Sequence, residues 1–335
     1  MRPRIDHSCT VDLNWPIHAS VFYHGHHFDP NMNTPLIGLD VGGTKIEVAV
    51  ITREAPHSFL FRHRLPTPSG SYELTLEVIE NLVQLARDQI QNLKLPQPER
   101  IGFGIPGCLD RTTQTVRGAN SQALNGKRLA QDLESSLNST VILQNDANCL
   151  GLSETLDGAC MDEPMVFAVI IGTGCGGGLV VNGKIWEGPN QIAAEWGHTP
   201  LPWMSDMEFQ NAQTCWCNKR ACMESFVSGP AFEKRNPSGL SAQETIRKMR
   251  EGHEPSLLLF KEYTNQLARG LAQITNILDP SCFVLGGGMS NIDELYPLLA
   301  LEMRRYTFHD KTSTPIKKAK HGDSSGVRGA AFLSA

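Results

Sequence analysis

The sequence predicts an α/β protein that has mixed sheets and two related lobes. Strand-like apolar runs alternate along the chain with segments of helical periodicity, which is the pattern of α/β proteins. "LIGLDVGGTKIEVAVI" (36–51) and "VFAVIIGTGCGGGLVVNG" (166–183) each place a glycine-containing turn between two apolar runs. Each is expected to form a hairpin, so the sheets are mixed and the fold is not a Rossmann fold. The repetition predicts two lobes that face a shared cleft.

The first lobe is expected to span residues 36–145. After the opening hairpin, residues 59–65 predict a third strand, and short strands follow at "IGFGIPG" (101–107) and "VILQNDAN" (141–148). The last of these runs into a helix. A further helix is predicted after the third strand, because apolar residues recur there near one face of a 3.6-residue period. These residues are Leu74, Val78, Leu82, Leu85 and Ile90.

The second lobe is expected to span residues 146–335. Beyond its hairpin, a long helix is predicted near 256–278, followed by a buried strand that ends in three glycines, "CFVLGGGMS" (282–290). The chain closes with "HGDSSGVRGAAFL" (321–333), which predicts a loop and a final helix that packs back on the first lobe. The apolar face of the long helix comprises Tyr263, Leu267, Leu271, Ile274 and Leu278.

Composition excludes several classes of protein. The 335-residue chain has a net charge of −5 and no long Lys/Arg run, which argues against nucleic-acid binding. No apolar run reaches the roughly 18 residues that span a bilayer. Nine cysteines, an odd number, indicate a reducing compartment, and we expect a cytoplasmic protein.

Residues 1–35 differ from the rest of the chain. They contain five of the chain's histidines, four of them between positions 18 and 27, and have no clear hydrophobic period. They lack the arrangement of a secretion signal. His-rich tracts sometimes bind metal, but a loosely docked or disordered extension is favoured. The natural start is expected to be either Met1 or Met32, just before the first strand.

The first glycine turn has the composition of a phosphate site. Gly42 and Gly43 allow a positive φ and let backbone N–H groups approach a ligand, Thr44 adds a hydroxyl donor, and Lys45 adds a positive charge. Asp40 ends the preceding strand, where a carboxylate could orient Mg²⁺ through water. A single turn of this kind is more often only a turn.

Two further glycine-rich segments strengthen the nucleotide hypothesis. "GTGCGGG" (172–178) repeats the first turn without its charge, and "GGG" (286–288) would let the backbone pack flat against a base or ribose. Neither a Walker A loop nor a dinucleotide fingerprint is present. Three such segments in one chain, two of them in matching hairpins, predict a nucleotide-binding cleft.

Other residues suggest catalysis or sugar binding more weakly. Asp146 follows an apolar strand at the start of a helix, where a general base and a helix N-cap are about equally expected from spacing. Glu195 and His198 form an E-x-x-H pair that could bind a polyhydroxyl ligand, although alone such a pair is more often a surface ion pair.

Three cysteines lie within eight residues. Cys215, Cys217 and Cys222 form C-x-C-x₄-C, and His198 can supply a fourth ligand, which is the donor set of a structural zinc site. A disulfide between Cys215 and Cys217 would be strained, and no C-x-x-C redox pair is present. Zinc is therefore favoured over a disulfide or unrelated core thiols.

The chain resembles the repressor–ORF–kinase (ROK) family of sugar kinases over residues 36–335. The motifs that carry the resemblance are "IGLDVGGTKIEVAV", "GFGIPG", "NDAN", "IIGTGCGGGLVVNG", "EWGH" and "CWCNKRACMES". In detail, "RHRLPTP", "EWGHTPLPWM", "NILDP", "VLGGGMSN" and "KAKHGDSSGVRGAA" look like the bacterial fructokinases, or manno(fructo)kinases, of that family. The resemblance implies a two-domain actin-like ATPase fold of the ribonuclease H-like type, with ATP and sugar in an interdomain cleft.

The resemblance also implies an activity and roles for individual residues. It implies ATP-dependent phosphorylation of a free hexose, first D-fructose to fructose 6-phosphate, with mannose and glucose as further acceptors, and with Asp146 as general base. The implied sugar-binding residues are Gly107, Asn120, Asn145, Glu195, His198 and Glu224. The implied ATP-binding residues are Gly38, Asp40, Gly42, Gly43, Thr44, Lys45, Gly172, Thr173, Gly174, Gly176, Gly177, Gly286, Gly287 and Gly288. Asp40 would serve Mg²⁺, and His198, Cys215, Cys217 and Cys222 would hold a structural Zn²⁺.

The cysteine cluster departs from the family pattern at two positions. The family's usual C-x-C-G-x-x-G-C has Asn218 and Ala221 here in place of its glycines. Asn tolerates a left-handed φ, whereas Ala is less comfortable there. All four ligands are retained, so the zinc prediction stands.

Three other interpretations compete with the fructokinase reading. The first is a kinase for glucose, N-acetylglucosamine or N-acetylmannosamine. The second is a sugar-responsive repressor, which needs an N-terminal helix-turn-helix domain that 35 irregular residues cannot supply. The third is a sugar-binding protein without catalysis, which Asp146 and the glycine turns disfavour. A homodimer is expected from the family.

Overall fold

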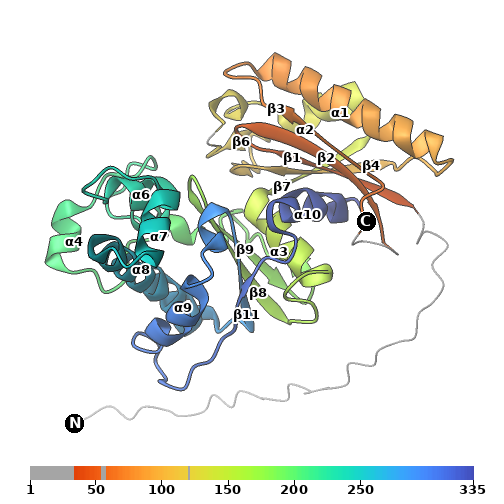
Figure 1. Ribbon diagram of the computed structural model, residues 1–335. Helices are drawn as coiled ribbons and strands as arrows, with labels where there is room; N and C mark the ends of the chain where they lie inside the picture. The colour runs from red at the N-terminus through yellow and green to blue at the C-terminus, as the bar shows by residue number, and fades with distance from the viewer. Residues whose placement is uncertain (1–33, 54–57, 120) are drawn as a thin grey trace, which may run out of the picture.

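The computed structural model describes residues 34–53, 58–119 and 121–335 (Figure 1). Within these residues the chain forms two five-stranded sheets and a two-stranded hairpin of β5 (Cys108–Leu109) and β6 (Val116–Arg117). Residues 1–33, which include the five histidines and Met32 of the N-terminal extension, lie outside the described residues, and so does Asn120. No helix in the described ranges is long and apolar enough to cross a membrane.

The first sheet has the strand order β3-β2-β1-β4-β7. β1 pairs antiparallel with β2 and parallel with β4, and β4 is parallel to β7. The prediction of a mixed sheet is therefore confirmed. The strand bounds are β1 (Pro35–Val41), β2 (Lys45–Thr52), β3 (Phe61–Pro66), β4 (Arg100–Ile105) and β7 (Thr140–Asn145).

Helix α1 (Tyr72–Asn92) follows β3 as predicted, but its buried face was only partly predicted. Leu82 and Ile90 are buried, whereas Leu74 and Leu85 are 49% and 37% exposed. Small residues explain the difference, because Thr75 and Ala86 belong to the buried face and a search for large apolar side chains passes over them. The short helix α2 (Leu129–Leu137) precedes β7.

The second sheet repeats the plan of the first, with the order β10-β9-β8-β11-β12. β8 and β9 form the second antiparallel hairpin, and β11 lies parallel to β8 and β12. The strand bounds are β8 (Met165–Ile171), β9 (Cys175–Val181), β10 (Lys184–Ile185), β11 (Cys282–Gly286) and β12 (Ile316–Lys318).

A cluster of helices completes this half of the molecule (Figure 1). The longest is α8 (Glu254–Leu278), which buries Tyr263, Leu267, Leu271 and Ile274 as predicted, while Leu278 at its end is 37% exposed. The other helices are α4 (Asp206–Asn211), α5 (Glu224–Val227), α6 (Gly229–Lys234), α7 (Ala242–Arg250) and α9 (Leu295–Met303).

Two helices, α3 (Asp146–Leu156) and α10 (Ser325–Leu333), lie between the sheets (Figure 1). The last helix of the chain contacts β1 and β4 of the first sheet as well as α3. Glycine makes this approach possible, because a Cβ at Gly102 would overlap the Ala330 backbone and one at Gly329 would overlap Cys149. Buried Glu154 accepts hydrogen bonds from Lys320 N (2.9 Å) and Ser325 Oγ (2.8 Å), which fixes the start of α10.

Candidate functional site

Asp146 lies at the junction of β7 and α3, with its carboxylate at the first residue of the helix. The N-cap is Asn145, whose Oδ1 accepts from Ala147 N (2.9 Å) while its Nδ2 donates to Gly107 O (3.0 Å). Asp146 therefore does not serve as the N-cap. Its Oδ1 accepts from Ala147 N (2.8 Å), so the backbone holds one of its two carboxylate oxygens and leaves the other available.

Gly107, which was predicted to bind sugar, is conformationally required beside this junction. Gly107 has φ +80°, and a Cβ there would strike the backbone of Arg117 and Gly118. The tight turn brings the 107–109 segment next to Asn145. The predicted sugar residues Gly107 and Asn145 thus lie together, next to Asp146.

Three of the predicted site carboxylic acids, Asp146, Asp40 and Glu195, have raised pKa values, and burial is the largest cause in each. Burial raises the pKa of Asp146 to about 6, and Glu195 adds to the rise, while the hydrogen bond from Ala147 N opposes it. Burial raises the pKa of Asp40 to about 7, with further contributions from Asp146 and Glu47. Because each carboxylate disfavours ionisation of its neighbour, the pair is suited to binding a cation or receiving a proton.

The first glycine turn joins β1 to β2. Gly42 N donates to Lys45 O (3.0 Å), and Thr67 Oγ1 donates to Gly42 O (2.7 Å). Neither Gly42 nor Gly43 has a positive φ, so glycine here permits close packing rather than a left-handed turn. Lys45 Nζ lies 3.7 Å from the exposed carboxylate of Asp323. A bound phosphate could take the place of that carboxylate, because an exposed ion pair contributes little stability.

The second glycine segment is shorter than predicted, because β9 begins at Cys175. Only Gly172, Thr173 and Gly174 form the turn, with Gly172 N donating to Gly174 O (3.0 Å). Gly176 and Gly177 lie within β9. A Cβ at Gly177 would strike Ala194 O and the Trp196 ring, so this glycine makes room for the segment that carries Glu195.

The third glycine segment ends β11 and lies beside the second turn. Gly287 has φ +85°, and a Cβ there would lie 2.5 Å from Ile171 O. Gly288 and Gly172 line one pocket of about 560 Å³, together with side chains of α7 such as Ile246 and Arg250. This pocket is large enough for a nucleoside. Gly38, another predicted ATP residue, is buried under α10 and faces Val327 and Ala331 instead of this pocket.

Glu195, His198 and Glu224 are brought together against β9. Glu195 precedes the 3₁₀ turn Trp196–His198, and Trp196 Nε1 donates to Gly176 O (2.9 Å). Glu224, at the start of α5, accepts from Cys175 N (3.0 Å). The second hairpin therefore holds Glu224 directly and Glu195 through its neighbour Trp196, the two acidic residues that were predicted to bind sugar.

The predicted zinc ligands converge. One ligand atom from each of His198, Cys215, Cys217 and Cys222 lies within 4.8 Å of all the others. His198 Nδ1 and Cys215 Sγ are 3.6 Å apart, as are the Cys217 and Cys222 sulfurs. Zinc–ligand bonds of about 2.0–2.3 Å in a tetrahedron give ligand separations of roughly 3.5–3.8 Å. The donor set and its spacing fit zinc.

The two departures from the family's cysteine pattern occupy left-handed backbone. Asn218 has φ +65° and Ala221 has φ +63°, the conformation that glycine adopts most readily. Asn218 is exposed, whereas Ala221 is buried, so its methyl group gains packing that offsets part of the backbone strain. The cluster thus keeps the turn geometry without its glycines.

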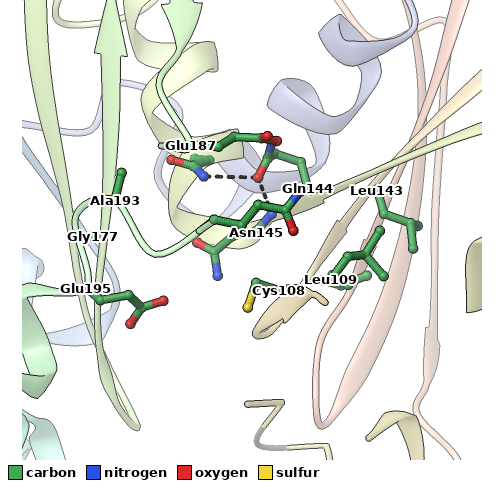
Figure 2. Close-up of a pocket in the computed structure, with 12 residues that line it drawn as sticks. Cys108, Leu109, Leu143, Gln144, Asn145, Gly177, Glu187, Ala193 and Glu195 are labelled. Atoms are coloured by element: carbon green, nitrogen blue, oxygen red, sulfur yellow. Dashed lines mark hydrogen bonds between the residues drawn. The ribbon is translucent and has the colours of Figure 1, made fainter. Parts of the chain in front are cut away.

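Sequence reasoning assigned no role to three polar residues that line one pocket. Gln144, Asn148 and Glu187 line the pocket that Asn145 and Glu195 share (Figure 2). Gln144 directly precedes the N-D pair, which is a weak signal. No motif marks Glu187, because it lies in the loop after β10, far from Gln144 in sequence.

Comparison with known proteins places this geometry in a family. The ROK family model matches residues 36–335. The N-acetyl-D-glucosamine kinase of Vibrio parahaemolyticus is 37% identical over 303 residues, which cover 88% of this chain and 98% of that protein. The enzyme of the same name from Haemophilus influenzae is 38% identical over 304 residues, with the same coverage.

Solved structures agree with the family assignment. A ROK hexokinase from Thermus thermophilus superposes with a TM-score of 0.77 at 28% identity, covering 90% of this chain and 98% of that one. A ROK family glucokinase from Streptomyces griseus, in complex with glucose and AMPPNP, gives 0.73 at 26% identity, covering 89% and 98%. The predicted two-domain actin-like ATPase fold is confirmed, whereas a particular closeness to fructokinases is not. The chain belongs to the ROK family.

Proposed function

We propose that the protein is an ATP-dependent sugar kinase that phosphorylates the 6-hydroxyl of a hexose. The observation that carries the proposal is the position of Asp146, which directly follows Asn145, the partner of Gly107, and whose carboxylate interacts electrostatically with Glu195. Gly172 and Gly288, from the second and third glycine segments, line one pocket. The relatives named above, which are sugar kinases by name, support the proposal.

In the proposed mechanism, the sugar hydroxyl attacks the γ-phosphorus of ATP and its proton passes to Asp146. The bond from that phosphorus to the β,γ-bridging oxygen breaks, and ADP leaves. The backbone N–H groups of the two hairpin turns and Lys45 would bind the phosphates. Mg²⁺, when bound near Asp40, would neutralise phosphate charge. Asn145, Glu195, His198 and Glu224 would hold the other sugar hydroxyls, so the attacking oxygen is aligned.

Zinc would act as a structural ion. Cys215, Cys217 and Cys222 with His198 would use all four tetrahedral positions, which leaves no site for an activated water. The ion would connect the segment that carries Glu195 and His198 to the segment that carries Glu224. Its expected role is to shape the sugar pocket.

Two acceptors are supported by different observations. The curated relatives support N-acetyl-D-glucosamine, because both are named as kinases of that sugar. The long motifs quoted above, such as "EWGHTPLPWM" and "KAKHGDSSGVRGAA", favour D-fructose, but the relatives support N-acetyl-D-glucosamine better. A homodimer and a cytoplasmic location stay predictions.

An ADP-release assay across D-fructose, D-mannose, D-glucose, N-acetyl-D-glucosamine and N-acetyl-D-mannosamine tests the proposal. Turnover with at least one sugar, and a product phosphorylated at O6, is the expected result. Highest kcat/KM with N-acetyl-D-glucosamine would select the first acceptor, and highest kcat/KM with D-fructose would select the second. Sugar binding without ADP release from any of the five would contradict the kinase proposal.

A further inference from the structure

A polar contact crosses the cleft beside the sugar-binding residues (Figure 2). Gln144, in β7 of the first sheet, donates from Nε2 to Glu187 Oε1 at 2.6 Å. Glu187 lies beyond β10 of the second sheet. The Oε1 atom of Gln144 accepts from Asn145 N (2.8 Å) and from Asn148 Nδ2 (3.0 Å). Gln144 therefore connects Glu187 directly to the residues on either side of Asp146.

The β5–β6 hairpin of the first half makes a second contact with the same loop. Arg111 lies 3.5 Å from Glu187, a half-exposed ion pair. The Gln191 side-chain amide, assigned to satisfy both of its polar atoms, donates to Leu109 O and accepts from Arg111 Nε at 3.3 Å. Two separate segments of the first half thus hold the loop of residues 187–195.

This loop transmits its position to Glu195. Ala193 N donates to Glu187 O (3.1 Å), and Glu195 N donates to Ile192 O (3.3 Å). At its start, Trp186 N donates to Leu179 O (2.8 Å), which ties the loop to β9. Because the loop is short and internally bonded, a shift at Glu187 displaces the backbone that presents Glu195.

An unpartnered polar atom indicates that a ligand group enters this pocket. Asn148 is 7% exposed, and its Oδ1 has no hydrogen-bond partner among the described residues. The amide lines the pocket that Asn145 and Glu195 also line. A buried acceptor without a partner is costly, and an O–H or N–H group of a bound sugar would satisfy it.

We propose that Gln144 and Glu187 form a cross-cleft brace that positions the sugar-binding loop. The brace rests on the proposed function, because it holds Glu195 opposite Asn145 and Asp146. Glu187 and Gln144 are positioning residues, and neither takes part in proton transfer. Gln144 supplies the neutral donor of the hydrogen bond to Glu187. The half-exposed ion pair of Arg111 with Glu187 is expected to add little to the stability of the loop.

The test compares Gln144→Ala, Glu187→Ala, the double variant and Glu187→Gln, each assayed with D-fructose and with N-acetyl-D-glucosamine. Loss of one hydrogen bond predicts a rise of about 3- to 10-fold in KM for the sugar, with KM for ATP unchanged. The double variant is expected to be no worse than Gln144→Ala, which also removes the acceptor of Asn145 N and Asn148 Nδ2. Glu187→Gln keeps an oxygen acceptor for Gln144 and should stay within about twofold of the wild type.

Arg305→Ala provides a matched control, since it removes the ion pair of an exposed arginine with Glu302 of α9, and neither residue lines the pockets described above. It should leave both KM values unchanged. Equal rises in the KM values for sugar and ATP, or additive effects in the double variant, would overturn the brace. Calorimetric sugar binding keeps the brace test separate from the proposed function: wild-type binding without turnover contradicts the kinase, whereas unchanged sugar affinity in Gln144→Ala contradicts the brace.

Discussion

The two hairpins have the same plan but present different chemistry. The β1–β2 turn is flanked by charged residues: Asp40 lies next to the end of β1, Lys45 begins β2, and buried Glu47 pairs with arginines of β3. β8–β9 has an uncharged turn, and its glycines continue into the strand, where Ala147 and Trp196 pack on them. The repeated fold therefore does not repeat the site.

The difference assigns a separate task to each half. The first hairpin contributes groups suited to phosphate and cation. In the proposed function, strand β9 is the platform for the sugar side, because Glu224 and Trp196 both hydrogen-bond to its backbone and α3 begins against Gly178. Changes within β9 should therefore affect sugar binding, whereas changes near β1–β2 should affect ATP.

Removal of zinc is expected to give the largest effect on the second half. A zinc-selective chelator, with Mg²⁺ kept saturating, should lower Tm by several degrees and raise KM for the sugar at least tenfold, since four ligands lose their common ion. KM for ATP should change much less. Thermal denaturation and steady-state kinetics measure both effects, and Zn²⁺ but not added Mg²⁺ should reverse them. A chelated protein with unchanged Tm and sugar KM would rule out this role.

Matched glycine substitutions compare the hairpins directly. In Gly178→Ala the new Cβ would lie 2.5 Å from Ala147 O, so the start of α3 must move, which predicts a loss of about 1–3 kcal/mol in stability and a lower kcat. In Gly42→Ala the nearest atom is Lys45 O at 3.0 Å, so we expect a smaller loss of stability and a higher KM for ATP. Urea denaturation and kinetics would distinguish them, and a higher sugar KM in Gly42→Ala alone would reverse the assignment.

The raised pKa values of Asp40 and Asp146 predict opposite pH effects on stability and activity. The folded state keeps protons up to about pH 6 and 7 that the unfolded state releases near 3.8, so these groups favour folding at low pH and lose that contribution as pH rises. Between pH 5 and pH 8 the wild type should therefore lose free energy of unfolding. Its loss should exceed that of Asp146→Asn by on the order of 1–3 kcal/mol. In contrast, kcat/KM should rise through about pH 6. Identical pH–stability curves for the two proteins would contradict the pKa assignment.

The smallest expected effect concerns the turn of the zinc cluster. Position 218 has φ +65°, which Asn tolerates better than Ala because its polar side chain can hydrogen-bond locally. Asn218→Ala should therefore lower the free energy of unfolding by about 1 kcal/mol. Asn218→Gly should be nearly neutral or slightly stabilising. Ala300→Gly in the exposed interior of α9 is the control and should destabilise by about 1 kcal/mol. Stabilisation by Asn218→Ala would show that the backbone strain is absent.

Site residues that stand beside an apolar strand could be predicted from the sequence, whereas contacts between segments distant in sequence could not. Asp146 and the glycine turns stand beside apolar strands that mark them. Gly176 and Gly177 look like turn residues, but they serve the packing of α3 and Trp196 on β9, which depends on segments distant in sequence. The contact between Gln144 and Glu187 was missed for the same reason, because neither residue belongs to a motif.

The central claim is that Asp146 removes the proton of the sugar hydroxyl, and Asp146→Asn tests it most directly. Asn is nearly isosteric but cannot accept the proton, so kcat should fall by about 10²- to 10⁴-fold. Calorimetric affinity for the acceptor sugar should stay within a few-fold of the wild type. Wild-type turnover in Asp146→Asn would contradict the account.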